Sequence, residues 1–174
     1  MFDRLIDLLL DSLGLFKFWE IVEPYEQAVV TRLGRYHRTL EEGFHWVLPL
    51  AIERVYGDSV VPTTHDLAPQ SLTTADGRSV VIRAVITRSI TDIRKAILEC
   101  EGVENVLVDS ATGAVADAVR AHSWDDLSSK DFAQALTTEV RERARPWGVK
   151  IHRVQLADIS ASRSLRLWTN STKP

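Results

Sequence analysis

The chain has 174 residues, of which 45% are hydrophobic, enough to bury one sizeable core but not two full-size independent domains. Its 21 basic and 24 acidic residues give a net charge of -3, so the composition does not favour a phosphate-backbone binder and no nucleic acid partner is expected. The single cysteine, Cys100, excludes an intramolecular disulfide, and without a second thiol or an HExxH pattern no metal or cofactor is expected.

The first 18 residues, MFDRLIDLLLDSLGLFKF, predict an amphipathic helix that lies in the plane of a membrane. At about 100° per residue the large apolar side chains share one arc and the charged ones the other. Because Asp3, Asp7 and Asp11 interrupt the apolar run, the segment is not expected to span a bilayer or to act as a secretory signal. The predicted membrane-binding residues are Phe2, Leu5, Ile6, Leu9, Leu10, Leu13 and Phe16.

The predicted membrane contact is apolar rather than electrostatic. Half-burial of seven large apolar side chains gives a gross gain on the order of 5–10 kcal/mol. The opposite arc is acidic, so attraction to anionic lipids adds little and binding should depend only weakly on salt. We therefore expect peripheral membrane association, on the cytoplasmic face. The alternative is that the same apolar stripe packs on the domain or on a helix of a partner.

Residues 19–57 predict the first, β-rich part of a folded domain. The strand-like segments are WEIV, QAVVTRLGRYHRTL and FHWVLPLAIERVY, each rich in β-branched and aromatic residues. Turn-forming residues around Pro24 and Gly43 separate them. We expect these segments to form a small antiparallel meander.

Residues 58–160 begin with a predicted β-hairpin. The dipeptide Asp76-Gly77 favours a tight type I′ turn, because both of its residues accept positive φ angles. The strand after this turn, SVVIRAVITRSI, alternates between an apolar and a mixed set of side chains. One face of this strand is therefore expected to be buried.

The pattern then becomes helical in DIRKAILEC and in VENVLVDSATGAVADAVRA. A third helix is predicted to begin after Ser128, with Asp131 as an acidic variant of the capping box and Pro146 beyond its end. The last strand is VKIHRVQLADI, and residues 161–174 are expected to form a short tail.

Three segments together resemble a known family. The first, VEPYEQAVVTRLGRYHRTLEEGFHWVLPLAIERV, is similar to the opening of the stomatin/prohibitin/flotillin (SPFH, band 7) domain through its RLGR and EGFH turns and its Leu48-Pro49 strand end. The second, LTTADGRSVVIRAVITRSITDIRKA, resembles the central hairpin and the D-x-x-K-A helix start. The third, RARPWGVKIHRVQLADI, resembles the junction between helix and closing strand. The match covers about residues 20 to 160 in the correct order.

The resemblance implies an α/β fold of the α+β type, with a curved, mostly antiparallel sheet flanked by helices. It also implies a non-catalytic scaffold at membranes, commonly a homo-oligomer that organises lipid domains or regulates membrane proteases and channels. The long helical segment that usually follows the domain in this family has no counterpart in SASRSLRLWTNSTKP, which shows no heptad pattern. The expected division is 1–18 (membrane helix), 19–160 (SPFH-like domain) and 161–174 (tail).

No residue pattern predicts an enzyme. The sequence holds no G-x-S-x-G motif and no glycine-rich phosphate loop. Ser128-Ser129-Lys130 is interpreted as a helix cap rather than as serine-lysine chemistry, and Asp125-Asp126 as a turn rather than a metal site. The run from Arg141 to Arg145 is typical of a solvated helix face, with a docking surface as the alternative. The rival to a membrane scaffold is a soluble interaction module whose N-terminal helix mediates self-association or partner binding.

Overall fold

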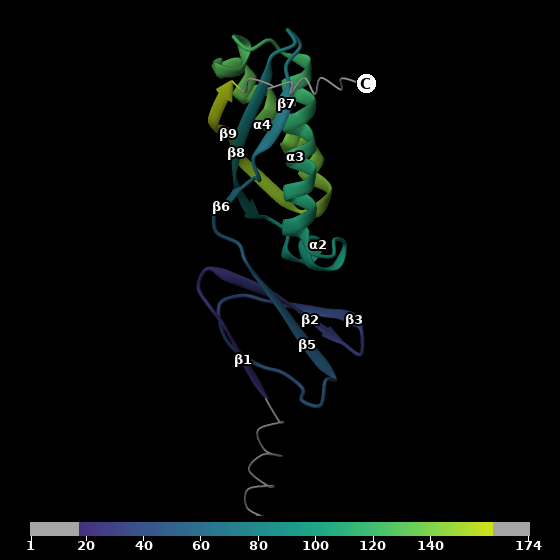
Figure 1. Cartoon of the computed structure of the whole chain (residues 1–174). Helices are drawn as coiled ribbons and strands as arrows, with labels where there is room; N and C mark the ends of the chain where they lie inside the picture. Colours follow the sequence, from purple (N-terminus) through teal and green to yellow (C-terminus); the bar gives the residue numbers. More distant parts are fainter. Residues whose placement is uncertain (1–17, 162–174) are drawn as a thin grey trace, which may run out of the picture. The chain divides into compact units, whose positions relative to one another are not determined.

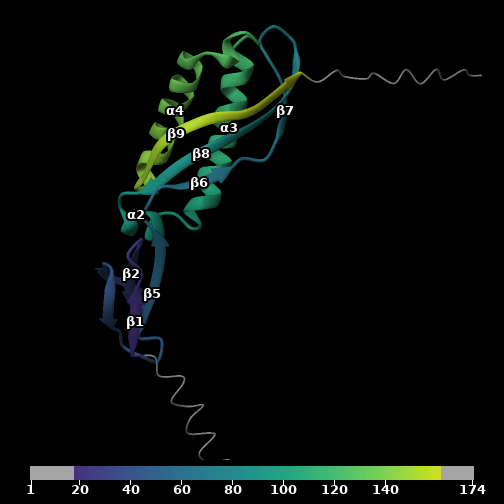
Figure 2. The ribbon, with the colours of Figure 1, turned by 90° about the vertical axis from the view of Figure 1, so that its left-hand side faces the viewer.

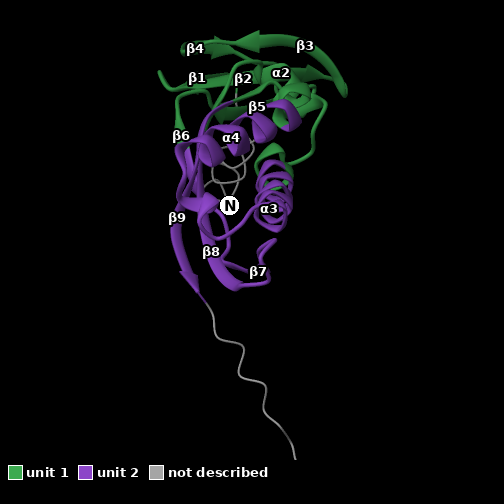
Figure 3. Cartoon of the chain, turned by 90° about the horizontal axis from the view of Figure 1, so that it is seen from above, with its two compact units in different colours: residues 1–63, 88–106, 144–150 green, residues 64–87, 107–143, 151–174 purple. Residues whose placement is uncertain are grey.

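The structure is a computed structural model that describes residues 18–161, and these residues fall into two compact units (Figures 1 and 3). Unit 1 comprises the described residues up to 63, together with 88–106 and 144–150. Unit 2 comprises 64–87, 107–143 and the described residues from 151 onwards. The predicted N-terminal helix lies outside the described residues.

The strands of unit 1 form two small antiparallel sheets. Their bounds are β1 (Trp19–Val22), β2 (Glu26–Arg32), β3 (Arg35–Leu40), β4 (Gly43–Trp46) and β5 (Glu53–Ser59). β1 pairs with β4, and β2 lies between β3 and β5. The predicted meander is wrong, because FHWVLPLAIERVY is not one strand. Left-handed backbone at Leu50 (φ 60°) and Ala51 (φ 57°) breaks it into β4 and β5, which join different sheets.

The core of unit 1 lies between these two sheets. Ala28, Val30 and Leu40 lie on one face of the β3-β2-β5 sheet, with Val55 packed beside them. Val22 of β1 belongs to the same buried cluster, so the β1/β4 pair covers this face.

A short helix, α2 (Ile93–Leu98), packs against β2 on unit 1. The carboxylate of Asp92 caps it by accepting the Lys95 N–H at 3.1 Å. The Arg94 guanidinium lies 4.6 Å from the ring centroid of Tyr36 on β3, which adds a cation–π contact.

Most of unit 2 is one four-stranded sheet with two helices. Its elements are β6 (Thr63–Asp66), β7 (Gln70–Thr73), β8 (Ser79–Ile90), β9 (Val149–Ala161), α3 (Val103–Ala121) and α4 (Lys130–Ala144), with the short 3-10 helix η1 (Asp126–Ser128). The 3-10 helix η2 (Arg145–Trp147) belongs to unit 1, as do the ends of β8, α3 and β9 at 88–90, 103–106 and 149–150. β8 is central and pairs with β6, β7 and β9, and α3 and α4 cover the same face of the sheet (Figure 2). Every second residue from Val80 to Ile86 on β8 is buried, as the alternation predicts.

The hairpin between β7 and β8 is confirmed, but its predicted type I′ turn is wrong. The strands end at the pair Thr73 and Ser79, which leaves a five-residue loop. Within it Gly77 alone has a positive φ, whereas a type I′ turn needs two such residues. The loop is longer because Thr74 closes it: its N–H donates to the Arg78 carbonyl at 3.0 Å, and its hydroxyl accepts the Arg78 N–H at 3.2 Å.

The three predicted helices are confirmed, with one correction at a cap. The hydroxyl of Ser129, not that of Ser128, accepts the Phe132 N–H at 3.1 Å and so begins α4. The mixed α/β fold with mostly antiparallel pairing is also confirmed. The single curved sheet is not: the described strands form three sheets, because β1 and β4 pair with each other, β2 pairs with β3 and β5, and β8 pairs with β6, β7 and β9.

Candidate membrane-binding face

The seven predicted membrane-binding side chains, from Phe2 to Phe16, all lie outside the described residues, so their role stays a prediction. The structure places the strand β1 directly after them, starting at Trp19. Any surface built on β1 is therefore next to the predicted helix along the chain.

Strongly exposed large hydrophobic side chains are confined to unit 1 within the described range. Unit 2 contributes none to this group. Large apolar side chains gathered on one part of a surface are typical of an interaction site. The members are Phe18, Trp19, Ile21, Tyr25, Leu33, Tyr36, Phe44, Trp46, Leu48, Leu50, Tyr56, Val61 and Leu98.

Four of these side chains form the outer face of the β1/β4 pair. Trp19 lies opposite Trp46 and Ile21 opposite Phe44, so all four point to the same side of the two-stranded sheet. They are between 47% and 68% exposed, whereas Val22, which points to the other side, is buried in the core. We call Trp19, Ile21, Phe44 and Trp46 the β1/β4 face.

Two aromatic rings of this face are in contact with each other. The centroids of Phe44 and Trp46 are 5.3 Å apart, and their planes meet at 89° in an edge-to-face contact. This contact fixes the two rings without covering them. The face therefore presents a preformed apolar surface to whatever lies outside unit 1.

Two loops of unit 1 expose further leucines. Leu33 in the β2–β3 turn and Leu50 in the β4–β5 loop both have positive φ angles, of 50° and 60°. A branched residue in this conformation costs on the order of 1 kcal/mol, so other contacts must hold the loops in place. One such contact joins them, since the Leu33 N–H donates to the carbonyl of Ile52 at 2.8 Å.

Glu53 is the main anchor of the β4–β5 loop. Its side chain is 1% exposed, and its Oε1 accepts from Arg32 at 3.0 Å (Nε) and 2.6 Å (Nη2). Its Oε2 accepts the backbone N–H of Leu48 at 2.9 Å. Arg38 lies 3.8 Å from the same carboxylate and also donates to the carbonyl of Trp46 on β4. The carboxylate thereby joins β2, β3 and the loop that follows the β1/β4 face.

The surroundings of Glu53 favour its ionised form. Burial acts to raise the pKa of this carboxyl, but the Leu48 N–H and the charges of Arg32 and Arg38 outweigh it and hold the pKa below its ordinary value. The group is therefore a carboxylate at neutral pH, with its negative charge compensated inside unit 1.

Ser129 and Asp126 have structural roles at the start of α4. Ser129 caps α4, and the carboxylate of Asp126 accepts the Ser123 hydroxyl at 2.6 Å in the turn before it. The hydrogen bonds from the Ser123 hydroxyl and the Ser123 N–H lower the pKa of Asp126. Across the described range no three His, Cys, Asp or Glu side chains are grouped as a metal site. Cys100 is buried.

Sequence reasoning missed the β1/β4 face, although the sequence carries a signal for it. WEIV and GFHW each place large apolar residues two apart, which puts both on one side of a strand. Most of GFHW lies instead within a longer predicted strand that continues through Pro49, which hides its pairing with WEIV. In the range 18–161 no helix combines the length and apolarity needed to cross a bilayer.

Comparison with known proteins agrees with this fold. The model of the SPFH domain / Band 7 family matches residues 20–166. An uncharacterised protein of Methanocaldococcus jannaschii is 28% identical over 164 residues, which cover 91% of this chain and 82% of that protein. A stomatin homologue of Pyrococcus horikoshii is 26% identical over 148 residues, covering 80% and 53%. A band 7 protein of Drosophila melanogaster is 25% identical over 150 residues, covering 84% and 30%.

The chain thus spans about half of the Pyrococcus stomatin homologue and less of the Drosophila protein. Because the family model matches most of the chain, this protein belongs to the SPFH domain / Band 7 family.

Proposed function

We propose that this chain is a non-catalytic scaffold that binds a membrane surface peripherally and self-associates there. It would organise regions of the membrane or regulate membrane proteins such as proteases. The observation that carries this proposal is the β1/β4 face, a preformed apolar surface that directly follows the predicted amphipathic helix.

The two apolar surfaces are expected to act together. Burying half of the four side chains of the β1/β4 face contributes on the order of 3–6 kcal/mol. Tryptophan rings are favoured at the membrane interface, where one edge is apolar and the other is wet. A single weak apolar anchor gives only marginal membrane binding, and stable attachment needs two. The helix would supply one anchor and the β1/β4 face the other.

Family membership supports the scaffold role. The two relatives named as stomatin homologues each match 80% of this chain, which in turn covers 53% of their length. Self-association and the regulation of a membrane protein remain part of the proposal, and the client protein has to be identified by experiment.

Removing the two tryptophans of the face should weaken membrane binding about tenfold or more. Trp19→Ser/Trp46→Ser deletes the largest cross-strand pair of the face, and loss of two half-buried tryptophans costs on the order of 2 kcal/mol. The measurement is flotation of the full chain with neutral phosphatidylcholine vesicles. Raising the salt concentration moderately should leave binding of the native chain almost unchanged.

The matched control is Tyr56→Ser/Leu98→Ser, which removes two exposed apolar side chains on the α2 side of unit 1. This variant should float as the native chain does. Equal loss of flotation in both double variants would contradict a specific membrane face.

The rival function is a soluble interaction module, in which a protein covers the apolar surfaces. Leu9→Asp/Leu13→Asp distinguishes the two. Under our proposal this variant loses vesicle binding and keeps its mass in plain buffer. If light scattering instead shows that the native chain is an oligomer in plain buffer and that this variant is a monomer, self-association replaces lipid binding as the role of the helix.

A further inference from the structure

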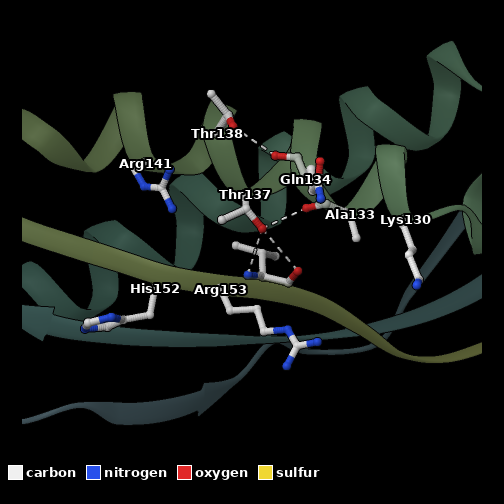
Figure 4. A pocket seen from close by; sticks show the side chains of 9 residues that line it. Lys130, Ala133, Gln134, Thr137, Thr138, Arg141, His152 and Arg153 are labelled. Carbon is white, nitrogen blue, oxygen red and sulfur yellow. Dashed lines mark hydrogen bonds between the residues drawn. The ribbon is translucent and has the colours of Figure 1, made fainter.

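A groove of about 600 Å³ lies on unit 2 between α4 and the edge strand β9 (Figure 4). The cationic lining residues are Lys130 and Arg141 of α4 and Arg153 of β9, and His152 of β9 also lines the groove. The other polar side chains that line it are uncharged. The groove therefore has positively charged walls and no acidic lining residue.

The three cationic side chains of the groove have no acidic partner among the described residues. Neither Lys130, Arg141 nor Arg153 has a carboxylate within ion-pair distance there. By contrast, Arg143, two residues after Arg141 on the same helix, pairs with Glu139 and lies 3.4 Å from Asp117. A concave site lined by cations of one sign raises the local concentration of anionic ligands.

The walls of the groove are rigid elements joined by hydrogen bonds. The Thr137 hydroxyl accepts the N–H of Val154 at 3.1 Å, and Arg141 Nε donates to the carbonyl of Ile151 at 3.2 Å. Between Ile151 and Val154 the alternation of buried and exposed residues along β9 shifts by one position, so that His152 and Arg153 are both exposed. The backbone of β9 is thus already bonded beside α4, and a ligand must be held mainly by side chains.

We propose that this groove binds an extended acidic peptide segment of a partner protein. Lys130 and Arg141 are eleven residues apart on α4, which corresponds to roughly 16 Å along the helix axis. A single phosphate group cannot reach both. An extended peptide rises about 3.3 Å per residue, so some five residues cover this length, and alternate acidic side chains point the same way.

The remaining lining fits a peptide. Gln134 and Thr138 lie between the cationic ends of the groove, where their side chains can hydrogen-bond a peptide backbone. Among the residues that the structure describes, unit 2 contributes no strongly exposed large hydrophobic side chain, and the groove lining holds no large apolar group that would insert into a bilayer. The site differs from the β1/β4 face in location and chemistry, and it can be tested independently of the proposed function.

The test is fluorescence anisotropy of a labelled Glu-Ser-Glu-Ser-Glu-Ser-Glu peptide with the full chain, at low ionic strength and constant non-ionic detergent. Lys130→Glu/Arg153→Glu should weaken binding at least tenfold, because each reversal turns attraction into repulsion. The control Arg35→Glu/Arg120→Glu changes the total charge equally at exposed positions outside the groove. It should bind the peptide within about twofold of the native chain.

Three results would overturn the proposal. One is equal weakening in both double variants, which would mean general charge attraction. Another is equal binding of the matched peptide with glutamine in place of glutamate. The third is displacement of the peptide from the native chain by anionic vesicles, together with weaker binding of Lys130→Glu/Arg153→Glu than of the native chain to the same vesicles, which would assign the groove to lipid headgroups.

Discussion

Glu53→Gln is expected to lower the free energy of unfolding by about 2–3 kcal/mol. Glutamine can still accept the Leu48 N–H, but it cannot compensate the charges of Arg32 and Arg38, which converge on this site. Removing one partner of a buried ion pair is costly because the other charge remains. The loss stays below the full buried-pair value because the side chains of Arg32 and Arg38 are 43% and 41% exposed and water screens them.

Thermal unfolding followed by circular dichroism measures this change, which should lower the melting temperature by roughly 5–10 °C. The matched control is Glu42→Gln, an identical substitution at an exposed position. Its melting temperature should differ from that of the native chain by less than about 2 °C. A similar melting temperature for both variants would show that the Glu53 carboxylate does not anchor the loop.

The same residue should make stability depend on acid. The pKa of Glu53 is lower in the folded protein than in the unfolded chain, so its contribution is fully present above about pH 4.3, the ordinary value for glutamate. The contribution is lost as the pH falls through the lower, folded-state pKa. Urea unfolding at several pH values below 5 should therefore show a steeper loss of stability in the native chain than in Glu53→Gln. Parallel curves would contradict this assignment.

Gly148→Ala is expected to cost about 2–5 kcal/mol of unfolding free energy. Gly148 has a φ of 69°, and a Cβ at this position would lie 2.6 Å from the carbonyl oxygen of Asp92. The close approach is maintained by three hydrogen bonds to the Gly148 carbonyl, from the Thr91 N–H and hydroxyl and from the Asp92 N–H, at 2.9 to 3.1 Å. Alanine would have to separate these segments.

Gly34→Ala separates the two contributions to this cost. Gly34 has a similar φ of 78°, but an added Cβ would meet nothing within 4 Å. It should lose only the backbone term, on the order of 1 kcal/mol. Chemical unfolding of both variants is the measurement, and equal losses would show that the clash with Asp92 is relieved without cost.

Local patterns in the sequence were sufficient to predict the helices and the β7–β8 hairpin. Helical periodicity and caps depend on residues within four positions of each other, and the hairpin depends on a short loop around Gly77. Pairing of β1 with β4 could not be predicted in this way. Twenty residues lie between the two strands, and the predicted strand after them is interrupted at Leu50 and Ala51, where no glycine marks the positive φ.

The candidate site likewise has a part that local sequence patterns predict and a part that depends on the fold. The apolar arc of residues 2–16 is a local helical pattern and could be proposed from the sequence alone. The β1/β4 face needs two strands in register, and the role of Glu53 needs Arg32 and Leu48 to converge on it. Such convergence is a property of the fold and not of any sequence window.

The interleaved order of the chain segments limits how this protein can be cut. Unit 1 is assembled from three stretches, of which the last ends at residue 150, and unit 2 uses the intervening stretches. A fragment ending at residue 63 would lack α2 and Gly148, and would leave the α2 side of β2 and β3 uncovered. Limited proteolysis or fragment expression should therefore release neither unit as a stable piece, so partner mapping requires point substitutions in the full chain.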